Sequence, residues 1–270
     1  MIDISMPEII ISTSWSDDNY NCSVLYTNIR HIHPMEHDLD SYPLFSETRS
    51  ETDRQNLSLS QKAYEMIRAR IVNLQLPPGQ FLDENRLQID LGLGRTPIRE
   101  ALLRLSHEQL VTIVPRRGIF VNDIGIEDLQ KLFEVRIVLE GLAARLAAQR
   151  GTEAHWRQMG LALSRLDHNQ SVDNSVLLSI DEACHLVLYD AASNEILRDT
   201  LTTLYALSKR LWVFLAVSTQ DTCSWLMEHT AILDALRSKD AARAGVLIEQ
   251  HIQSFQEHIH AAILGTSLPS

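Results

Sequence analysis

Residues 92–105 combine a turn with an amphipathic segment, and they constrain the fold of this chain more than any other stretch. Ile98, Leu102 and Leu105 lie at helical spacing and share one face that can pack inward. The outward side carries four polar residues: Arg95, Thr96, Arg99 and Arg104. Arginines near the N-terminus of such a helix can enter the major groove of DNA and bind phosphates or guanine. The stretch therefore predicts the turn and recognition helix of a helix-turn-helix, with these four residues as DNA contacts.

The flanking segments predict the rest of a winged helix. Apolar residues at helical spacing indicate a helix over 59–74, which a Pro-Pro-Gly sequence then ends. Asp83 is a suitable N-cap for a short helix that stops near Gly92. Two β-rich runs, 110–114 and 119–121, surround a turn and indicate a hairpin. The tip of this wing carries three candidate DNA contacts: Arg116, Arg117 and Gly118.

The charge distribution agrees with a DNA contact in this segment alone. The whole chain has a formal net charge of −11, which is unfavourable for binding nucleic acid. Residues 57–123 hold 9 basic and 7 acidic residues, a net charge of +2. Residues 1–56 hold 3 and 10, and residues 124–270 hold 12 and 18. On a lone helix the same arginines would be an ordinary solvated face, but the helix-turn-helix pattern favours contact with DNA.

Three motifs in this segment resemble the DNA-binding domain of GntR-family bacterial transcription regulators. They are LPPGQFLDENRL at 76–87, GRTPIREALLRL at 94–105 and VPRRGIFV at 114–121. The resemblance implies that four residues contact the operator: Arg95, Thr96, Arg99 and Gly118. Gly94 departs from the family pattern because it stands where Ser or Thr is usual, so the recognition helix loses a hydroxyl cap. Gln88 stands where a small alanine is usual.

The remainder of the chain, from about residue 127, has the periodicity of helices and almost no β alternation. The predicted helices cover 127–150, 153–169, 173–191, 194–217, 223–238 and 240–264. In the first of them we expect an apolar stripe of seven residues: Leu129, Leu132, Phe133, Ile137, Leu139, Leu142 and Leu146. Short polar breaks separate the helices, which is typical of an antiparallel bundle. The predicted fold class is thus mainly α, a winged helix-turn-helix followed by an all-α bundle.

Four residues on the predicted bundle helices have the chemistry of a metal site: Asp181, His185, His229 and His251. Asp181 and His185 are four residues apart and therefore share one helix face. A carboxylate and three imidazoles suit zinc, and also nickel, manganese or iron. A buried Asp with three His would be costly without a metal or other partners. His185, taken alone, would more often be an ordinary core histidine.

Four segments of the bundle resemble the FCD domain of the FadR subfamily: RIVLEGLAARLAA, DEACHLVLYDAASN, EHTAILDAL and AGVLIEQHIQ. The resemblance covers about 129–264 and implies that Asp181, His185, His229 and His251 are the metal ligands. It also implies that Arg136 pairs with a carboxylate of a small organic acid effector. Arg136 and Glu140 are four residues apart, so the alternative is a simple surface ion pair. Ser193-Asn194 replaces the usual Gly-Asn.

These observations divide the chain into three segments. Residues 1–56 are acidic and lack periodicity, so we expect a disordered extension. We expect a winged helix-turn-helix domain over 57–123 and a helical effector-binding and dimerisation domain over 127–265. The three cysteines have no CxxC spacing, which favours a reducing cytoplasm over a disulfide framework. No apolar run is long enough for a membrane span.

The predicted function is that of a cytoplasmic, homodimeric DNA-binding regulator with a palindromic operator. The resemblance to the family implies a repressor, which releases the operator when it binds a carboxylate. One alternative is a helical metalloenzyme with a DNA-binding appendage. That alternative lacks an HExxH motif or an evident base and nucleophile beside the metal. A second alternative is a metal sensor, whose effector is the ion itself.

Overall fold

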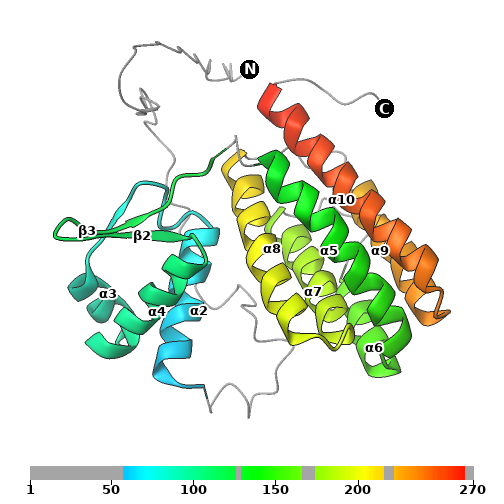
Figure 1. Ribbon diagram of the computed structural model, residues 1–270, viewed down its shortest axis with the longest axis horizontal. Coiled ribbons are helices and arrows are strands. Elements are labelled where there is room, and N and C mark those ends of the chain that lie inside the picture. Colours follow the sequence, from blue (N-terminus) through cyan, green and yellow to red (C-terminus); the bar gives the residue numbers. More distant parts are fainter. Residues whose placement is uncertain (1–56, 126–128, 166–173, 216–221, 265–270) are drawn as a thin grey trace, which may run out of the picture. The chain divides into compact units, whose positions relative to one another are not determined.

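The computed structural model describes residues 57–125, 129–165, 174–215 and 222–264 (Figure 1). The predicted disordered extension, 1–56, lies outside the described residues. The described part is a winged helix followed by a helical bundle, as predicted. No described helix is both long and apolar enough to cross a membrane.

The winged helix contains three helices and a small sheet. Its elements are α2 (Leu59–Val72), β1 (Phe81–Leu82), α3 (Glu84–Leu91), α4 (Arg95–His107), β2 (Val111–Val114) and β3 (Gly118–Val121). The sheet is antiparallel in the order β1-β3-β2, with Phe81 opposite Phe120 and Thr112 opposite Phe120 on the other side. The strand β1 was not predicted from the sequence because two residues are too few to show alternation.

The ends of these helices follow local capping chemistry. The Asp83 carboxylate accepts hydrogen bonds from the backbone N–H groups of Asn85 and Arg86 and so begins α3. Gly92 ends it with a left-handed conformation at φ +65°. Gly94 precedes α4 and provides no side-chain cap, as its departure from the family pattern implied. These turns fix the angle at which α4 leaves α3.

The core of the winged helix confirms the inward face predicted for the recognition helix. Ile98, Leu102 and Leu105 are fully buried there, together with Ile67 and Ile71 of α2. This core is distinct from that of the helical bundle. The winged helix therefore has its own apolar support, and substitutions in the bundle core need not unfold it.

Gly118 is required at its position by the packing of the wing. It has φ +112°, a conformation that L-residues rarely adopt, and a Cβ atom there would overlap the Phe81 ring. We expect Gly118→Ala to destabilise the protein by about 1–3 kcal/mol, measured as a lowered midpoint of urea unfolding. Gly94→Ala is the matched control, because Gly94 has φ −70° and an added Cβ would lie 3.9 Å from Pro97 Cδ. Equal midpoints for the two variants would contradict this account of the wing.

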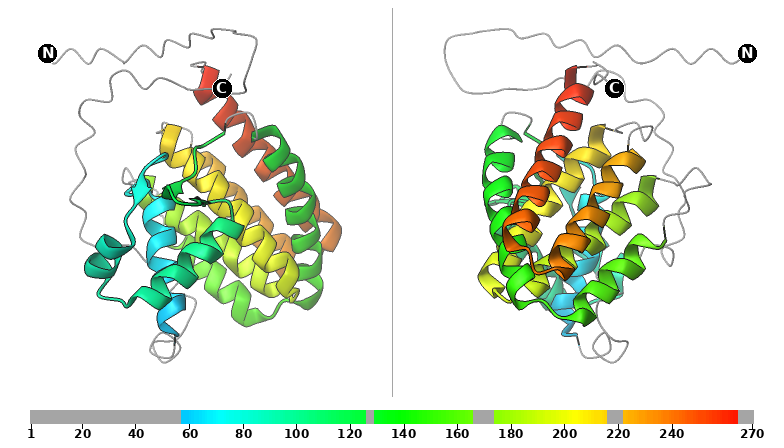
Figure 2. Two further views of the ribbon diagram at one scale, coloured as in Figure 1. Left: turned by 60° about the vertical axis from the view of Figure 1, so that its left-hand side comes forward. Right: turned by 90° about the vertical axis from the view of Figure 1, so that its right-hand side faces the viewer.

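Six helices form the bundle: α5 (Leu129–Arg150), α6 (Glu153–Leu163), α7 (Asn174–Ala191), α8 (Glu195–Leu215), α9 (Thr222–Arg237) and α10 (Ala241–Leu264). The two views of Figure 2 show them running alongside one another, with α10 against α5. Their bounds agree with the predicted helices within two residues, except that the helix predicted over 153–169 ends at Leu163. The bundle core contains aromatic residues such as Phe133, Trp212 and Phe255, of which the last two stack at 5.1 Å between ring centroids.

The predicted apolar stripe of the first bundle helix is wrong at Leu142, which is 40% exposed. The buried face of α5 is made instead largely of small residues: Gly141, Ala143, Ala144, Ala147 and Ala148. A Cβ atom at Gly141 would overlap the side chain of Glu249 on α10, which pairs with Arg145 at 2.9 Å. Small residues allow the two helices to approach closely, and the larger leucine is left on the outer side.

Candidate metal centre and DNA-contact face

The outer face of α4 presents the residues that the sequence predicted to contact DNA. Arg95, Thr96 and Arg99 are exposed. The Nε atoms of Arg95 and Arg99 lie 3.5 Å and 3.3 Å from the Glu84 carboxylate of α3. Glu84 therefore pairs with both guanidinium groups. These ion pairs are weak because the two arginine side chains are exposed. Two adjacent, solvated arginines at the start of a helix can exchange such a partner for phosphate or guanine.

Arg104 differs from Arg95 and Arg99 because its guanidinium packs on an aromatic ring of α2. Its guanidinium lies over the Tyr64 ring, 3.7 Å from the centroid, and donates to Gln61 Oε1 at 2.9 Å. Its Nε atom lies 3.3 Å from Glu108, which is the C-cap of α4. Arg104 thus joins α4 to α2, and a role in DNA contact stays a prediction.

The wing places Arg116 and Arg117 at the exposed turn between β2 and β3. Arg116 has φ +63° and therefore lies in the left-handed region at the tip of the turn. Gly118 follows, and its close approach to the Phe81 ring gives it a structural role beside the predicted DNA contact. The three candidate wing residues are adjacent at one edge of the domain.

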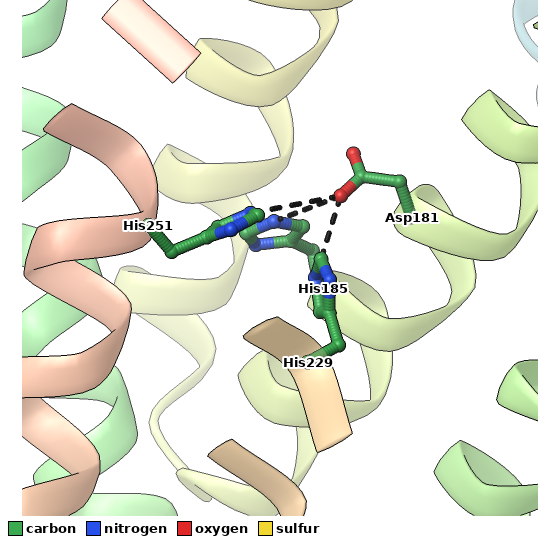
Figure 3. A group of neighbouring side chains, drawn as sticks. All are labelled: Asp181, His185, His229 and His251. Atoms are coloured by element: carbon green, nitrogen blue, oxygen red, sulfur yellow. Dashed lines mark ion pairs between the residues drawn. The ribbon is translucent and has the colours of Figure 1, made fainter. Parts of the chain in front are cut away.

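The bundle brings together the four residues predicted as metal ligands (Figure 3). Asp181 and His185 come from α7, His229 from α9 and His251 from α10. The Nε2 atoms of the three rings lie 3.4 Å, 3.3 Å and 3.8 Å, in that order, from Asp181 Oδ1. One atom from each residue falls within a group no more than 4.8 Å across, and all four residues are buried. Dashed lines in Figure 3 show the three rings converging on one carboxylate oxygen.

The donor set and its geometry fit a divalent metal ion. Asp181 Oδ1 and His185 Nε2 are buried and make no hydrogen bond within the described structure. Zinc–nitrogen bonds of about 2.0–2.1 Å place neighbouring tetrahedral ligands about 3.3–3.4 Å apart, close to these separations. Buried polar atoms without a hydrogen bond are costly, and an ion at their centre would satisfy them. The cluster could therefore hold a metal ion.

A second group of hydrogen bonds surrounds the cluster. Glu140 is fully buried, and its Oε2 atom lies 2.9 Å from His185 Nδ1. Its Oε1 atom accepts from the Arg136 guanidinium at 3.0 Å and 2.8 Å and from the Tyr189 hydroxyl at 2.7 Å. The surface ion pair considered for Arg136 and Glu140 is therefore wrong, because both side chains are buried and tied to the cluster. The i, i+4 spacing was the sequence signal, but it did not show burial.

Two further neighbours were not identified from the sequence. Tyr205 of α8 donates from its hydroxyl to Asp181 Oδ2 at 2.5 Å. Glu228 of α9 places Oε2 2.7 Å from His251 Nδ1. Each lies on a different helix from its partner, so no local spacing could reveal the contact. For Glu228 the only signal was its position next to His229.

The charges around the cluster compensate one another. Burial lowers the pKa of His185, but the carboxylates of Glu140 and Asp181 outweigh it and raise that pKa to about 9. Burial raises the pKa of Glu140, while His185 and Arg136 outweigh it and lower that pKa to about 2. With no metal bound, a proton on His185 therefore offsets part of the buried negative charge. A divalent ion would replace that proton.

A small cavity adjoins the cluster. Its volume is about 10 Å³, enough for roughly one water molecule. Its wall includes Asp181, His185 and His251 together with Arg136, Tyr205, Lys209 and Phe255. Lys209 is paired with Glu182 at 2.6 Å. The cavity therefore connects the candidate metal ligands with cationic and aromatic groups.

Known proteins match both parts of the chain. Residues 59–121 match the family described as "Bacterial regulatory proteins, gntR family", and residues 131–254 match the FCD domain. The Nta operon transcriptional regulator of Aminobacter aminovorans is 31% identical over 196 residues, 71% of this chain and 92% of that protein. The chain belongs to the GntR family. The HTH-type transcriptional repressor RspR of Escherichia coli is 26% identical over 205 residues, 74% of this chain and 89% of RspR.

Solved GntR structures support the same fold. E. coli McbR/YncC has a TM-score of 0.68 at 22% identity and covers 76% of this chain and 98% of its own. A putative GntR regulator from Rhodococcus has a TM-score of 0.61 at 20% identity, with 78% and 100% covered. The domains and the named relatives are those of a transcription regulator with a DNA-binding helix-turn-helix. The protein is therefore a regulator, and the alternative of a metalloenzyme is wrong.

Proposed function

We propose that this GntR-family protein is a ligand-responsive repressor that acts in the cytoplasm and binds one divalent ion and one small carboxylate in its helical bundle. The convergence of Asp181, His185, His229 and His251 carries the proposal. These four residues would hold the ion, with zinc the first candidate and nickel, manganese or iron as others. The ion would supply positive charge and open positions for an effector carboxylate. A relative that is named a repressor favours repression.

The winged helix and the helical bundle, which have separate cores, would have separate functions. The winged helix, 57–123, would bind the operator through Arg95, Thr96 and Arg99, with the wing residues Arg116, Arg117 and Gly118. The segment 127–265 would bind the effector and form a homodimer. The sign of the charge supports the first assignment, since 57–123 carries a net charge of +2, from 9 basic and 7 acidic residues.

Arg136 is the proposed partner of the effector carboxylate. Its guanidinium is buried and forms part of the cavity wall beside the candidate ligands. Arginine suits this role because its planar fork matches a carboxylate. A cavity of about 10 Å³ is smaller than any organic acid. Effector binding would therefore have to displace side chains around it, which gives the ligand a means of changing helix packing.

Contacts of α8 supply a route from the cavity to the winged helix. Tyr205 on α8 contacts Asp181, as described above, and three residues earlier the Thr202 carbonyl accepts from Arg68 of α2 at 2.8 Å. Arg68 in turn lies 3.8 Å from Glu108, the C-cap of α4. A shift of α8 on effector binding would therefore change the contacts of α2 and α4. Coupling free energies of this kind are about 1–3 kcal/mol, or a 5–150-fold change in DNA affinity.

A thermal-shift screen of small carboxylic acids tests the proposal. The zinc-loaded and the zinc-free protein are compared with each acid. We expect at least one acid to raise the unfolding midpoint of the zinc-loaded protein alone and to weaken operator binding. If zinc alone releases DNA and no acid adds to it, the protein is a metal sensor. If neither zinc nor any acid changes stability or DNA binding, the proposal fails.

The proposed homodimer has a candidate surface on α5. Val135, Val138 and Leu142 lie on one outer stripe of this helix and are 47%, 64% and 40% exposed. Adjacent exposed apolar side chains on one helix face are typical of a protein interface. A two-fold dimer would place two winged helices on the half-sites of a palindrome.

We expect Val138→Glu to convert the dimer to a monomer, because each subunit would bury a carboxylate in the proposed interface. Light scattering measures the mass, and Val246→Glu is the control, because Val246 is an exposed valine on α10 (49% against 64% for Val138). Wild type that is monomeric, or a dimer unaffected by Val138→Glu, would contradict the assignment of this surface.

A further inference from the structure

Glu228 is a carboxylate at the surface of the bundle that reaches a buried histidine. Its side chain is 41% exposed, whereas the ring of His251 is fully buried. Oε2 of Glu228 lies 2.7 Å from Nδ1 of His251, and Nε2 of the same ring faces Asp181 Oδ1 at 3.8 Å. The two nitrogens of His251 therefore point to different partners, one toward the surface and one toward the cluster.

An imidazole binds a metal through one nitrogen while the other carries hydrogen. A carboxylate that accepts the N–H fixes which nitrogen is available and how the ring is oriented, and it makes the ligand nitrogen a better donor. With Glu228 at Nδ1, the lone pair of His251 is left at Nε2, directed at the cluster. Residues in this position commonly change metal affinity by about 10–100-fold when they are replaced.

We propose that Glu228 is a positioning residue of the metal centre, which holds His251 by Nδ1 and thereby sets the affinity of the centre for its ion. The inference rests on the proposed metal binding and adds a determinant outside the four ligands. It also makes the affinity depend on a solvent-accessible side chain, although the ligands themselves are buried.

Glu140 contacts Nδ1 of His185 as Glu228 contacts Nδ1 of His251, but Glu228 can be replaced with less disturbance. Glu140 is fully buried and also binds Arg136 and Tyr189, so replacing it would leave a buried guanidinium without its carboxylate. Glu228 has one described hydrogen bond, to His251, and a half-exposed side chain. Its replacement should leave the packing of the bundle intact.

The experiment compares zinc affinities of the full-length wild type, Glu228→Gln and Glu228→Ala by competition with a chromophoric chelator. We expect Glu228→Ala to bind zinc about 10–100-fold more weakly. The zinc affinity of Glu228→Gln should lie between those of the wild type and Glu228→Ala, because the amide oxygen can still accept a hydrogen bond from Nδ1–H of His251. Asp234→Ala is the control, since it removes one exposed negative charge from the same helix without a described contact to the cluster. The visible spectrum of the cobalt-loaded proteins should change in Glu228→Ala and be largely restored in Glu228→Gln.

Each outcome decides the inference. Zinc binding by Glu228→Ala at the wild-type affinity overturns it, and leaves the metal centre itself in place if the wild type retains zinc. An equal loss in Asp234→Ala, or a Glu228→Gln variant as weak as Glu228→Ala, overturns the role of the hydrogen bond. A wild type that binds no zinc overturns the inference together with the proposed metal centre. Unfolding midpoints of the metal-free variants should match the wild type, and a lowered midpoint would indicate a structural role instead.

Discussion

Arg99→Ala is expected to abolish specific operator binding while the fold is retained. Arg99 is 60% exposed on α4, and its described partner is the Glu84 carboxylate at 3.3 Å, so its removal opens no core cavity. A direct arginine contact to a base is worth about 1–3 kcal/mol. In a two-fold complex the contact is lost at both half-sites, which amounts to about 2–6 kcal/mol. Affinity for the operator should then approach that for unrelated DNA.

Fluorescence anisotropy with a duplex selected by the wild-type protein measures this effect at a fixed salt concentration. Arg70→Ala is the matched control, because it removes the same charge from α2 of the same domain, away from the predicted contacts. Circular dichroism should be unchanged in both variants. Wild-type affinity and sequence preference in Arg99→Ala would remove α4 as the recognition helix.

The second large effect is expected from His229→Ala, which should lose metal binding and the effector response together while it still binds DNA. His229 is buried and contributes one of the four converging ligand atoms, and no other described histidine can take its place in the cluster. The winged helix has a separate core, so operator binding without effector should stay near the wild-type value. In the wild type, an acid found in the screen should lower the affinity for the operator about 5–150-fold.

His260→Ala, an exposed histidine on α10, serves as the control and should respond like the wild type. A His229→Ala protein that still answers the acid would show that the four residues are structural. Loss of DNA binding in this variant would instead mean that the cluster supports the whole fold.

Much of the fold could be predicted from the sequence because its signals are local. Asp83 and Gly92 mark the ends of α3 by capping chemistry, and the inward spacing of Ile98 and Leu102 predicts the face of α4. The pair Asp181 and His185 share a helix face by their spacing alone. His229 and His251 were added to this pair from their chemistry on two later predicted helices, and the resemblance to the FCD domain implied the same four ligands.

What could not be predicted depends on contacts between distant segments. Glu140, Tyr205 and Glu228 take their roles from partners on other helices, and periodicity gives a face without saying which residue opposes it. Leu142 was assigned to the core because it is apolar, but the buried face of α5 is made largely of glycine and alanine, and Leu142 lies on the outer side. Arg104 was grouped with the other arginines of α4, although the Tyr64 ring holds it within the domain.

Metal content is the measurement that tests the account most directly. Wild type and His229→Ala are dialysed against zinc, transferred to metal-free buffer and measured by inductively coupled plasma mass spectrometry with a parallel protein assay. We predict about one zinc ion per chain in the wild type and none in His229→Ala, as four converging ligands require. A wild type without zinc, or equal zinc in both proteins, would contradict the proposed centre.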